Sequence, residues 1–188
     1  MKSICRKMAR AARHFFAKFA GPLLKALWPQ YMSGGNVHDP NLVFGAWFRQ
    51  KMLRRNGQVS WPVHRTTEVR APERIQRGSR TPGLSAGCYL DGRNGIILGP
   101  NVWIGPHVSL ISMNHDSINY EKYLIADPIR IDQDCWLGQG ATVLPSVHLG
   151  PHTVVGAGAI VTKSFPSGNQ LIGGNPARFI KHLPPYEN

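Results

Sequence analysis

A short polar segment, Asn114, His115 and Asp116, carries the side chains best suited to acid–base chemistry in this 188-residue chain. Neutral imidazole removes a proton from a hydroxyl efficiently because the unperturbed pKa of histidine, about 6.5, lies close to working pH. The second ring nitrogen of such a base needs a fixed partner, and either Asp116 or a backbone carbonyl could accept its N–H. The segment therefore predicts His115 as a general base, with Asp116 as one of two candidates for the orienting group.

The sequence does not favour a covalent acyl-enzyme intermediate. An acyl-enzyme would need an accessible nucleophile with a base of its own. Cys135 falls on a small, inward-facing position of a repeat, and Ser112 has no evident base besides His115. We therefore expect the acceptor hydroxyl to attack directly, within a complex that holds both reactants.

The scaffold around this segment is a six-residue repeat. A large aliphatic residue stands at every sixth position, namely Ile131, Leu137, Val143, Leu149, Val155 and Val161. Small or apolar residues follow four positions later, namely Cys135, Ala141, Val147, Thr153 and Ala159. A period of six matches neither an α-helix nor a long strand, but it fits a triangular prism whose faces are short strands and whose corners are tight turns. Three repeats close one coil, so the pattern predicts a mainly β fold, a parallel β-helix.

The repeat is interrupted once, next to His115. Leu110 and Ile131 are separated by 21 residues, which is three repeats and three further residues. Residues 112–130 must therefore leave the prism, at least in part, as an extruded loop. A loop on a rigid scaffold is where a functional site is expected.

The repeat ends after Pro166, and the remaining chain predicts a cap. Residues 173–176 read as a turn with Pro176 at the first position of a helix. Residues 177–183 then form a short amphipathic helix that covers the open end of the prism. We thus expect a basic helical extension over 1–58, the β-helix over 59–172 with its loop at 112–130, and a C-terminal turn and capping helix over 173–188.

Charge is distributed unevenly along the chain. Residues 1–80 contain 16 Lys and Arg against 3 Asp and Glu, so all of the net charge of +12 comes from them. Residues 1–28 place apolar side chains at helical spacing opposite a cationic face. Such a helix could pack on its own domain or a neighbouring subunit, or it could bind an anionic membrane surface. Nucleic acid is a less favoured partner, because no aromatic–basic binding module accompanies the charge.

The number of cysteines and the length of the apolar segments indicate the cellular compartment of the protein. Cys5, Cys88 and Cys135 are odd in number and far apart, which argues against a disulfide scaffold and suits a reducing environment. Basic residues interrupt the N-terminal apolar positions, unlike a signal peptide, and no run of 18 apolar residues occurs. We expect a cytoplasmic protein, with residues 1–28 as its candidate contact with the inner membrane face.

Four motifs raise a family resemblance. They are NGIILGPNVWIGPHVSLISMNHD (94–116), DPIRIDQDCWLGQGATVLPSVHLG (127–150), VVGAGAIVTKSFP (154–166) and GGNPARFIK (173–181). With them, residues 82–183 resemble the hexapeptide-repeat acyltransferases, nearest to the galactoside, maltose, nodulation and polysaccharide O-acetyltransferase branch. The resemblance implies a left-handed β-helix, a homotrimer with active sites between subunits, acetyl-coenzyme A as acyl donor without a metal, and His115 as base.

The resemblance also implies which residues bind the reactants. Those expected to line coenzyme A are Trp136, Gln139, Gly140, Ala157, Thr162, Lys163 and Arg178. Lys163, Arg178 and Lys181 would meet its phosphates, and a backbone N–H near Gly140 would stabilise the oxyanion. Asp91, Asn94 and Asn114 are candidate ligands of the acceptor, although a structural turn is the simpler explanation of Asp91 and Asn94.

The predicted function is transfer of acetyl to a sugar hydroxyl, in surface polysaccharide or glycolipid synthesis. An antibiotic acceptor is the alternative within the same branch. A β-helix metalloenzyme of the carbonic anhydrase type is a weaker alternative, raised by His107, His115, His148 and His152. A non-enzymatic scaffold or nucleic-acid-binding protein is the remaining one.

Overall fold

The computed structural model describes residues 22, 26 and 40–187. The chain divides into two compact units, Met1–Gly57 and Gln58–Asn188. In the first unit the described element is helix α3 (Pro40–Lys51), which begins with a proline whose missing N–H a first helical turn tolerates. Ala46 and Gln50, four residues apart and so on one helix face, are buried. The predicted amphipathic helix over 1–28 falls almost wholly outside the described residues.

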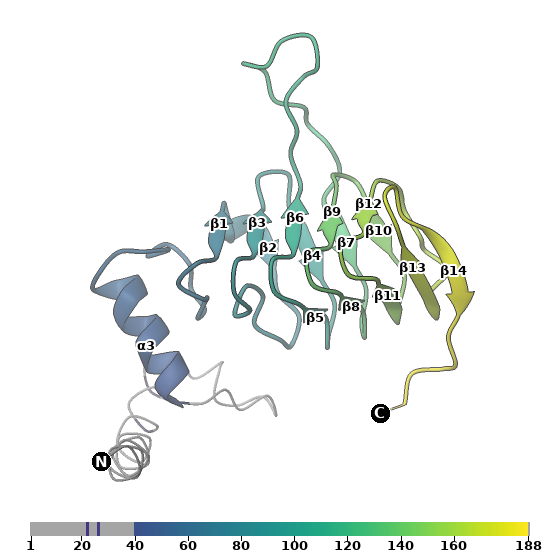
Figure 1. Ribbon diagram of the computed structural model, residues 1–188. Coiled ribbons are helices and arrows are strands. Elements are labelled where there is room, and N and C mark those ends of the chain that lie inside the picture. Colours follow the sequence, from purple (N-terminus) through teal and green to yellow (C-terminus); the bar gives the residue numbers. More distant parts are fainter. Residues whose placement is uncertain (1–21, 23–25, 27–39, 188) are drawn as a thin grey trace, which may run out of the picture. The chain divides into compact units, whose positions relative to one another are not determined.

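Three sheets of very short strands make up the second unit (Figure 1). Sheet A contains β1 (Glu68–Arg70), β3 (Tyr89–Asp91), β6 (Ser109–Ile111), β9 (Thr142–Val143) and β12 (Ile160–Val161). Sheet B contains β2 (Ile75–Gln76), β4 (Ile96–Leu98), β7 (Ile129–Ile131) and β10 (His148–Leu149). Sheet C contains β5 (Trp103–Ile104), β8 (Trp136–Leu137), β11 (Thr153–Val155), β13 (Gln170–Gly173) and β14 (Arg178–His182). A 3-10 turn, Pro72–Arg74, precedes β2.

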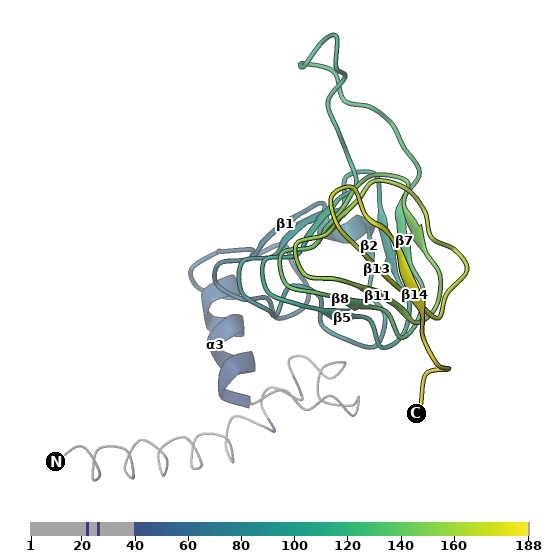
Figure 2. The same cartoon turned by 45° about the vertical axis from the view of Figure 1, so that its right-hand side comes forward.

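From β4 onward the chain visits the sheets in the order B, C, A and returns to B one coil further along. The oblique view in Figure 2 shows the stacked coils. Register partners in successive coils confirm the predicted period, since Trp136 pairs with Val154 and Thr142 with Ile160. Strands β1 to β13 pair in parallel. The fold is the predicted left-handed parallel β-helix.

The core consists of the two inward positions of each repeat. Each predicted aliphatic and each predicted small residue from 131 to 161 is at most 1% exposed. Neighbouring coils also satisfy each other's backbone groups, as in the N–H of Ser109 that donates to the carbonyl of Ala141 at 2.9 Å. The burial of both positions explains why the period is six and why the second side chain must be small.

The predicted loop is present and projects from the stack between β6 and β7 (Figures 1 and 2). It spans 112–128, because Ile129 and Arg130 already belong to β7. Ile129 is fully buried and pairs with Ile96, so packing against the preceding coil ends the loop two residues before the predicted boundary.

The C-terminal prediction is wrong in one respect, because residues 178–182 form strand β14 and not a helix. After a turn at Gly174, where φ is 96°, this strand runs antiparallel to β13. A helix of about two turns is marginal on its own, whereas a strand here pairs with backbone groups at the exposed edge of β13. Phe179 and Ile180 also favour extended backbone.

Within the described residues, no helix is long and apolar enough to cross a membrane.

Candidate functional site

His115 lies in the stem of the loop, opposite Tyr123. The two residues form an isolated antiparallel bridge, and their rings lie 4.4 Å apart between centroids. Nδ1 of His115 contacts the carbonyl oxygen of Tyr120. A carbonyl can only accept, so this contact places the proton on Nδ1 and leaves the lone pair on Nε2. The exposed imidazole is thus oriented as a base.

The orienting group is therefore the backbone carbonyl of Tyr120, and the alternative of Asp116 is not what the structure shows. The carboxylate of Asp116 accepts the N–H of Ile118 at 2.7 Å. This contact stabilises the turn at the loop tip. Neither tyrosine carried a signal in the sequence beyond its place in the loop, because the contacts depend on how the loop folds back.

Asn94 fastens both limbs of the loop to the preceding coil. Its side-chain N–H groups donate to the carbonyls of Ser112 at 3.0 Å and Leu124 at 2.9 Å. Its backbone N–H donates to the hydroxyl of Ser112, which is fully buried. The carbonyl of Asn114 accepts the N–H of Leu124 at 2.9 Å. These bonds fit the structural explanation of Asn94 and account for Ser112 as a support of the loop.

Asp91 is unsuited to binding an acceptor, which corrects that prediction. The residue is fully buried in β3, and Arg93 holds its carboxylate with Nε at 2.9 Å from Oδ1 and Nη2 at 2.7 Å from Oδ2. The hydrogen bonds that Arg93 donates to this carboxylate raise the pKa of Arg93, against the opposing effect of partial burial. Asp91 is therefore the anchor of an internal ion pair, a role its sequence position did not reveal.

The predicted coenzyme A residues occupy more than one part of the β-helix. Trp136 is about half exposed on the outer face of sheet C, beside its register partner Trp103. Gln139, Gly140 and Ala157 lie at the corner between sheets C and A. At this corner Gly140 has φ of 69°, and its N–H donates to the carbonyl of Pro106 at 2.9 Å. The N–H of Gly140 itself is therefore already used within the chain, and the oxyanion donor near Gly140 stays a prediction.

The remaining predicted residues lie elsewhere. Thr162 and Lys163 follow β12 at the corner between sheets A and B, the same edge from which the loop leaves two coils earlier. Arg178 begins β14 and donates to the carbonyl of Ala177, and Lys181 is exposed on the same strand. One chain thus places His115 at one edge of the prism and Gln139, Gly140 and Ala157 at another.

Two of the histidines that raised the metal alternative, His148 and His152, have polar partners. Nε2 of His148 lies 2.8 Å from Asp132, and Nδ1 of His152 lies 2.9 Å from Asn169. Across the part of the chain that the structure describes, no three His, Cys, Asp or Glu side chains are grouped so that they could hold a metal ion.

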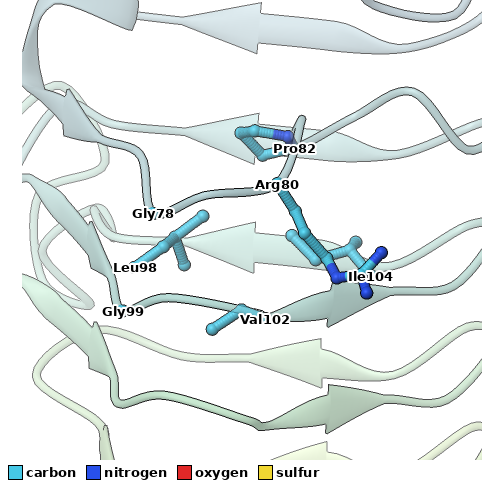
Figure 3. Close-up of a pocket in the computed structure, with 7 residues that line it drawn as sticks. All are labelled: Gly78, Arg80, Pro82, Leu98, Gly99, Val102 and Ile104. Atoms are coloured by element: carbon cyan, nitrogen blue, oxygen red, sulfur yellow. The ribbon is translucent and has the colours of Figure 1, made fainter. Parts of the chain in front are cut away.

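A hollow among the first coils is distinct from the loop (Figure 3). The lining residues are Gly78, Arg80, Pro82, Leu98, Gly99, Val102 and Ile104. Arg80 is tied down here, because its guanidinium lies 3.2 Å from the ring centroid of Trp103 and its Nε donates to Asn101. The cavity volume, about 10 Å³, is far below the roughly 300 Å³ of small-molecule sites. It results from the irregular segment 77–88 between β2 and β3.

Comparison with known proteins matches the repeat directly. Residues 128–163 match the family described as bacterial transferase hexapeptide, six repeats. This segment of the chain therefore carries the hexapeptide repeat of that family. The matched segment spans β7 to β12, the coils with the regular aliphatic positions.

Curated relatives match about half of this chain. The galactoside O-acetyltransferase of Escherichia coli is 33% identical over 91 residues, which are 47% of this chain and 44% of that protein. The chain spans about half the length of the curated relatives it matches.

Two solved structures share the fold. A maltose O-acetyltransferase of Clostridium difficile 630 superposes with a TM-score of 0.53 at 20% identity, covering 93% of this chain and 89% of that one. A galactoside acetyltransferase in complex with coenzyme A superposes with a TM-score of 0.52 at 21% identity, covering 90% and 83%.

Proposed function

We propose that this hexapeptide-repeat protein transfers an acetyl group from acetyl-coenzyme A to a hydroxyl of a sugar. The observation that carries the proposal is the geometry of His115, whose Nδ1 is held by the carbonyl of Tyr120 so that Nε2 is free to accept a proton. The matched repeat and the named O-acetyltransferases support the reaction class.

In the proposed mechanism Nε2 of His115 removes the hydroxyl proton while the acceptor oxygen attacks the thioester carbonyl carbon. A C–O bond forms, the C–S bond breaks, and the leaving thiolate takes the proton back from the imidazolium. The Tyr120 carbonyl accepts the Nδ1–H throughout, so the ring keeps its orientation as its charge changes. No acyl-enzyme is required, since the buried thiol of Cys135 has its pKa raised by burial to about 12.

Acetyl-coenzyme A is proposed to lie along the C-terminal coils. Supporting features are the exposed indole of Trp136 and the exposed side chains of Gln139, Thr162, Lys163 and Arg178. Gly140 and Ala157 complete this proposed surface, and the relative solved with coenzyme A supports a donor of this kind. Cationic Lys163 and Arg178 would pair with the phosphates.

A homotrimer is proposed because one chain does not bring these groups together. The loop with His115 leaves the A–B corner, whereas Gln139, Gly140 and Ala157 are at the C–A corner. A second copy that brings its C–A corner to this loop completes the site. Ile118 and Ile125 are 95% exposed near the loop tip, and a neighbouring subunit would cover them.

For the acceptor we propose a sugar carried in surface polysaccharide or glycolipid assembly, in the cytoplasm. The names of the O-acetyltransferase relatives support a sugar. The basic composition of residues 1–28 supports contact with an anionic membrane, which vesicles with and without anionic lipid would test in a pull-down. Equal binding to both vesicle types would contradict that contact.

The deciding experiment measures thiol release from acetyl-coenzyme A with a panel of sugars, glycolipid extracts and hydroxylated antibiotics. We expect acceptor-dependent turnover that falls by about a hundredfold or more in His115→Ala. His148→Ala is the matched control, because His148 lies on sheet B and pairs with Asp132 away from the loop. Equal loss in both variants, or none in His115→Ala, would remove His115 from the mechanism.

A further inference from the structure

We propose that Arg93 is a positioning residue for His115, acting through Tyr123. This inference rests on the proposed role of His115 as the base. Arg93 is in the coil that precedes the loop, and it links a buried carboxylate at one end to the imidazole at the other. Neither Arg93 nor Tyr123 was among the residues that the sequence singled out.

The first link is the ion pair between Arg93 and Asp91. The Asp91 side chain is 1% exposed, and both of its oxygens are engaged by the guanidinium. The backbone N–H of Arg93 donates to the same carboxylate at 3.2 Å. A buried carboxylate with a fork-shaped partner holds that partner in one geometry, because leaving the charge unpaired is costly. The guanidinium is therefore fixed to the rigid β-helix.

The second link is the contact between Arg93 and Tyr123. The guanidinium carbon lies 4.8 Å from the centroid of the Tyr123 ring, within the range of a cation–π interaction. The third link is the tilted packing of the Tyr123 ring on His115, at 4.4 Å between centroids. A continuous series of contacts thus runs from the core of β3 to the imidazole.

The loop needs such a support. Tyr123 and Tyr120 are 50% and 75% exposed, so solvent surrounds the residues that touch the imidazole. Asn94 fixes the backbone of the stem, but its bonds to Ser112 and Leu124 do not reach the ring of His115. A base displaced by about 1 Å from its productive position can lose roughly a hundredfold in rate. Arg93 limits that displacement by holding Tyr123.

The chain contains a matched arginine for comparison. Arg70 also pairs with the acidic residue two positions before it, with Nε 2.8 Å from Glu68, and it lies 5.6 Å from the ring centroid of Tyr89. It occupies sheet A one coil earlier, because Arg70 and Asp91 are register partners. Tyr89, however, belongs to β3 and not to the loop. Arg70→Met therefore removes the same chemistry without touching the loop.

The kinetic test compares Arg93→Met, Tyr123→Leu, Tyr123→Phe and Arg70→Met with wild type. We expect Arg93→Met and Tyr123→Leu to lower kcat by about tenfold to a hundredfold while KM for acetyl-coenzyme A stays within about twofold. Arg70→Met leaves the loop alone, so it should stay within about twofold of wild type. Tyr123→Phe keeps the ring and removes only the hydroxyl, so it should lose less kcat than Tyr123→Leu. Arg93→Met leaves a buried carboxylate without its partner and could fail to fold. Tyr123→Leu leaves this ion pair intact, so it tests the same series of contacts in a protein that should fold.

A second readout does not depend on turnover. Nitrogen-15 NMR of labelled histidines distinguishes the ring tautomers, and the signals lost in His115→Ala identify those of His115. We expect a single tautomer protonated at Nδ1 in wild type, Tyr123→Phe and Arg70→Met, and a mixture in Arg93→Met and Tyr123→Leu.

The two readouts separate the possible failures. Absence of turnover with every acceptor would reject the proposed function, while the NMR comparison would still decide the positioning role. An unchanged His115 spectrum in both Arg93→Met and Tyr123→Leu would overturn the role of Arg93. Equal loss of kcat in Arg93→Met and Arg70→Met would overturn it as well, because the effect would then not depend on the loop.

Discussion

The regular coils over 129–163 and the loop over 112–128 differ in how far their side chains are buried and in what holds their backbone in place. In the coils, each repeat buries two side chains almost completely, and neighbouring coils satisfy the backbone groups of the strands. In the loop, Ile118 and Ile125 are 95% exposed, and a small number of contacts holds the stem to the preceding coil. The difference suggests that the stack supplies stability and the loop supplies chemistry, so substitutions in the two regions should change different measurements.

Thiol reactivity should show the largest contrast between the two regions. Burial raises the pKa of Cys88, and it raises that of Cys135 to about 12. In a Cys5→Ser background, we expect these thiols to react with a thiol reagent at pH 8 about a thousandfold more slowly than Ser117→Cys does at an exposed position of the loop. Denaturant should remove the difference, and fast reaction of the folded Cys5→Ser protein would contradict the burial of both thiols.

The next largest effect should be on folding. Leu137 is fully buried in β8, so Leu137→Ala is expected to lower the free energy of unfolding by about 2–5 kcal/mol. Ser117→Ala, at an exposed position of the loop, should change it by about 0.5 kcal/mol or less. Urea unfolding at one fixed protein concentration measures both. Comparable losses would show that the loop also contributes to the stability of the assembly.

Loosening the loop should have an intermediate effect on turnover. Asn94→Ala removes the donors to the carbonyls of Ser112 and Leu124, so both limbs of the loop lose their attachment. We expect kcat to fall about tenfold, with a loss of about 1–2 kcal/mol in unfolding free energy. Proteolysis within 112–128 should become faster. Unchanged proteolysis together with unchanged kcat would show that the remaining contacts suffice.

The smallest effect concerns acid stability of the coils. Partial burial opposes ionisation of Asp132, but hydrogen bonds from His148 and Arg130 outweigh it and lower the pKa of Asp132. The resulting stabilisation is complete above the unfolded-state pKa, about 3.9, and is lost as pH falls through the lower folded-state value. Asp132→Asn should therefore be less stable than wild type near pH 6 by under about 1 kcal/mol. The difference should vanish in strong acid, and a constant difference across pH would contradict this linkage.

Some of the structure followed from the sequence because it depends on repetition. A side chain that recurs every six residues meets the same environment in each coil, so residues 131–161 specified the coil, its inward positions and the place where the pattern fails. The loop followed for the same reason, since 21 residues between Leu110 and Ile131 do not fit a whole number of repeats. Its end was misplaced because the burial of Ile129 depends on pairing with Ile96.

Other features depended on contacts between residues that are distant in sequence. Residues 178–182 have an amphipathic pattern, yet the open edge of β13 made a strand the better partner. Asp116 is adjacent to His115, yet the carbonyl of Tyr120 reaches the imidazole because the loop folds back on itself. Asp91 was a candidate ligand beside a structural explanation, and its burial and its pairing with Arg93 favour the structural one.

The sequence by itself determined the repeat, the β-helix and the loop that bears His115, because each repeat shows the same pattern of buried positions. Only the tertiary structure decided which groups hold the imidazole and where the predicted donor-binding residues lie. The loop leaves the prism at one corner, and the glycine turns lie at another. The repeat pattern in the sequence does not show how these corners are arranged in space.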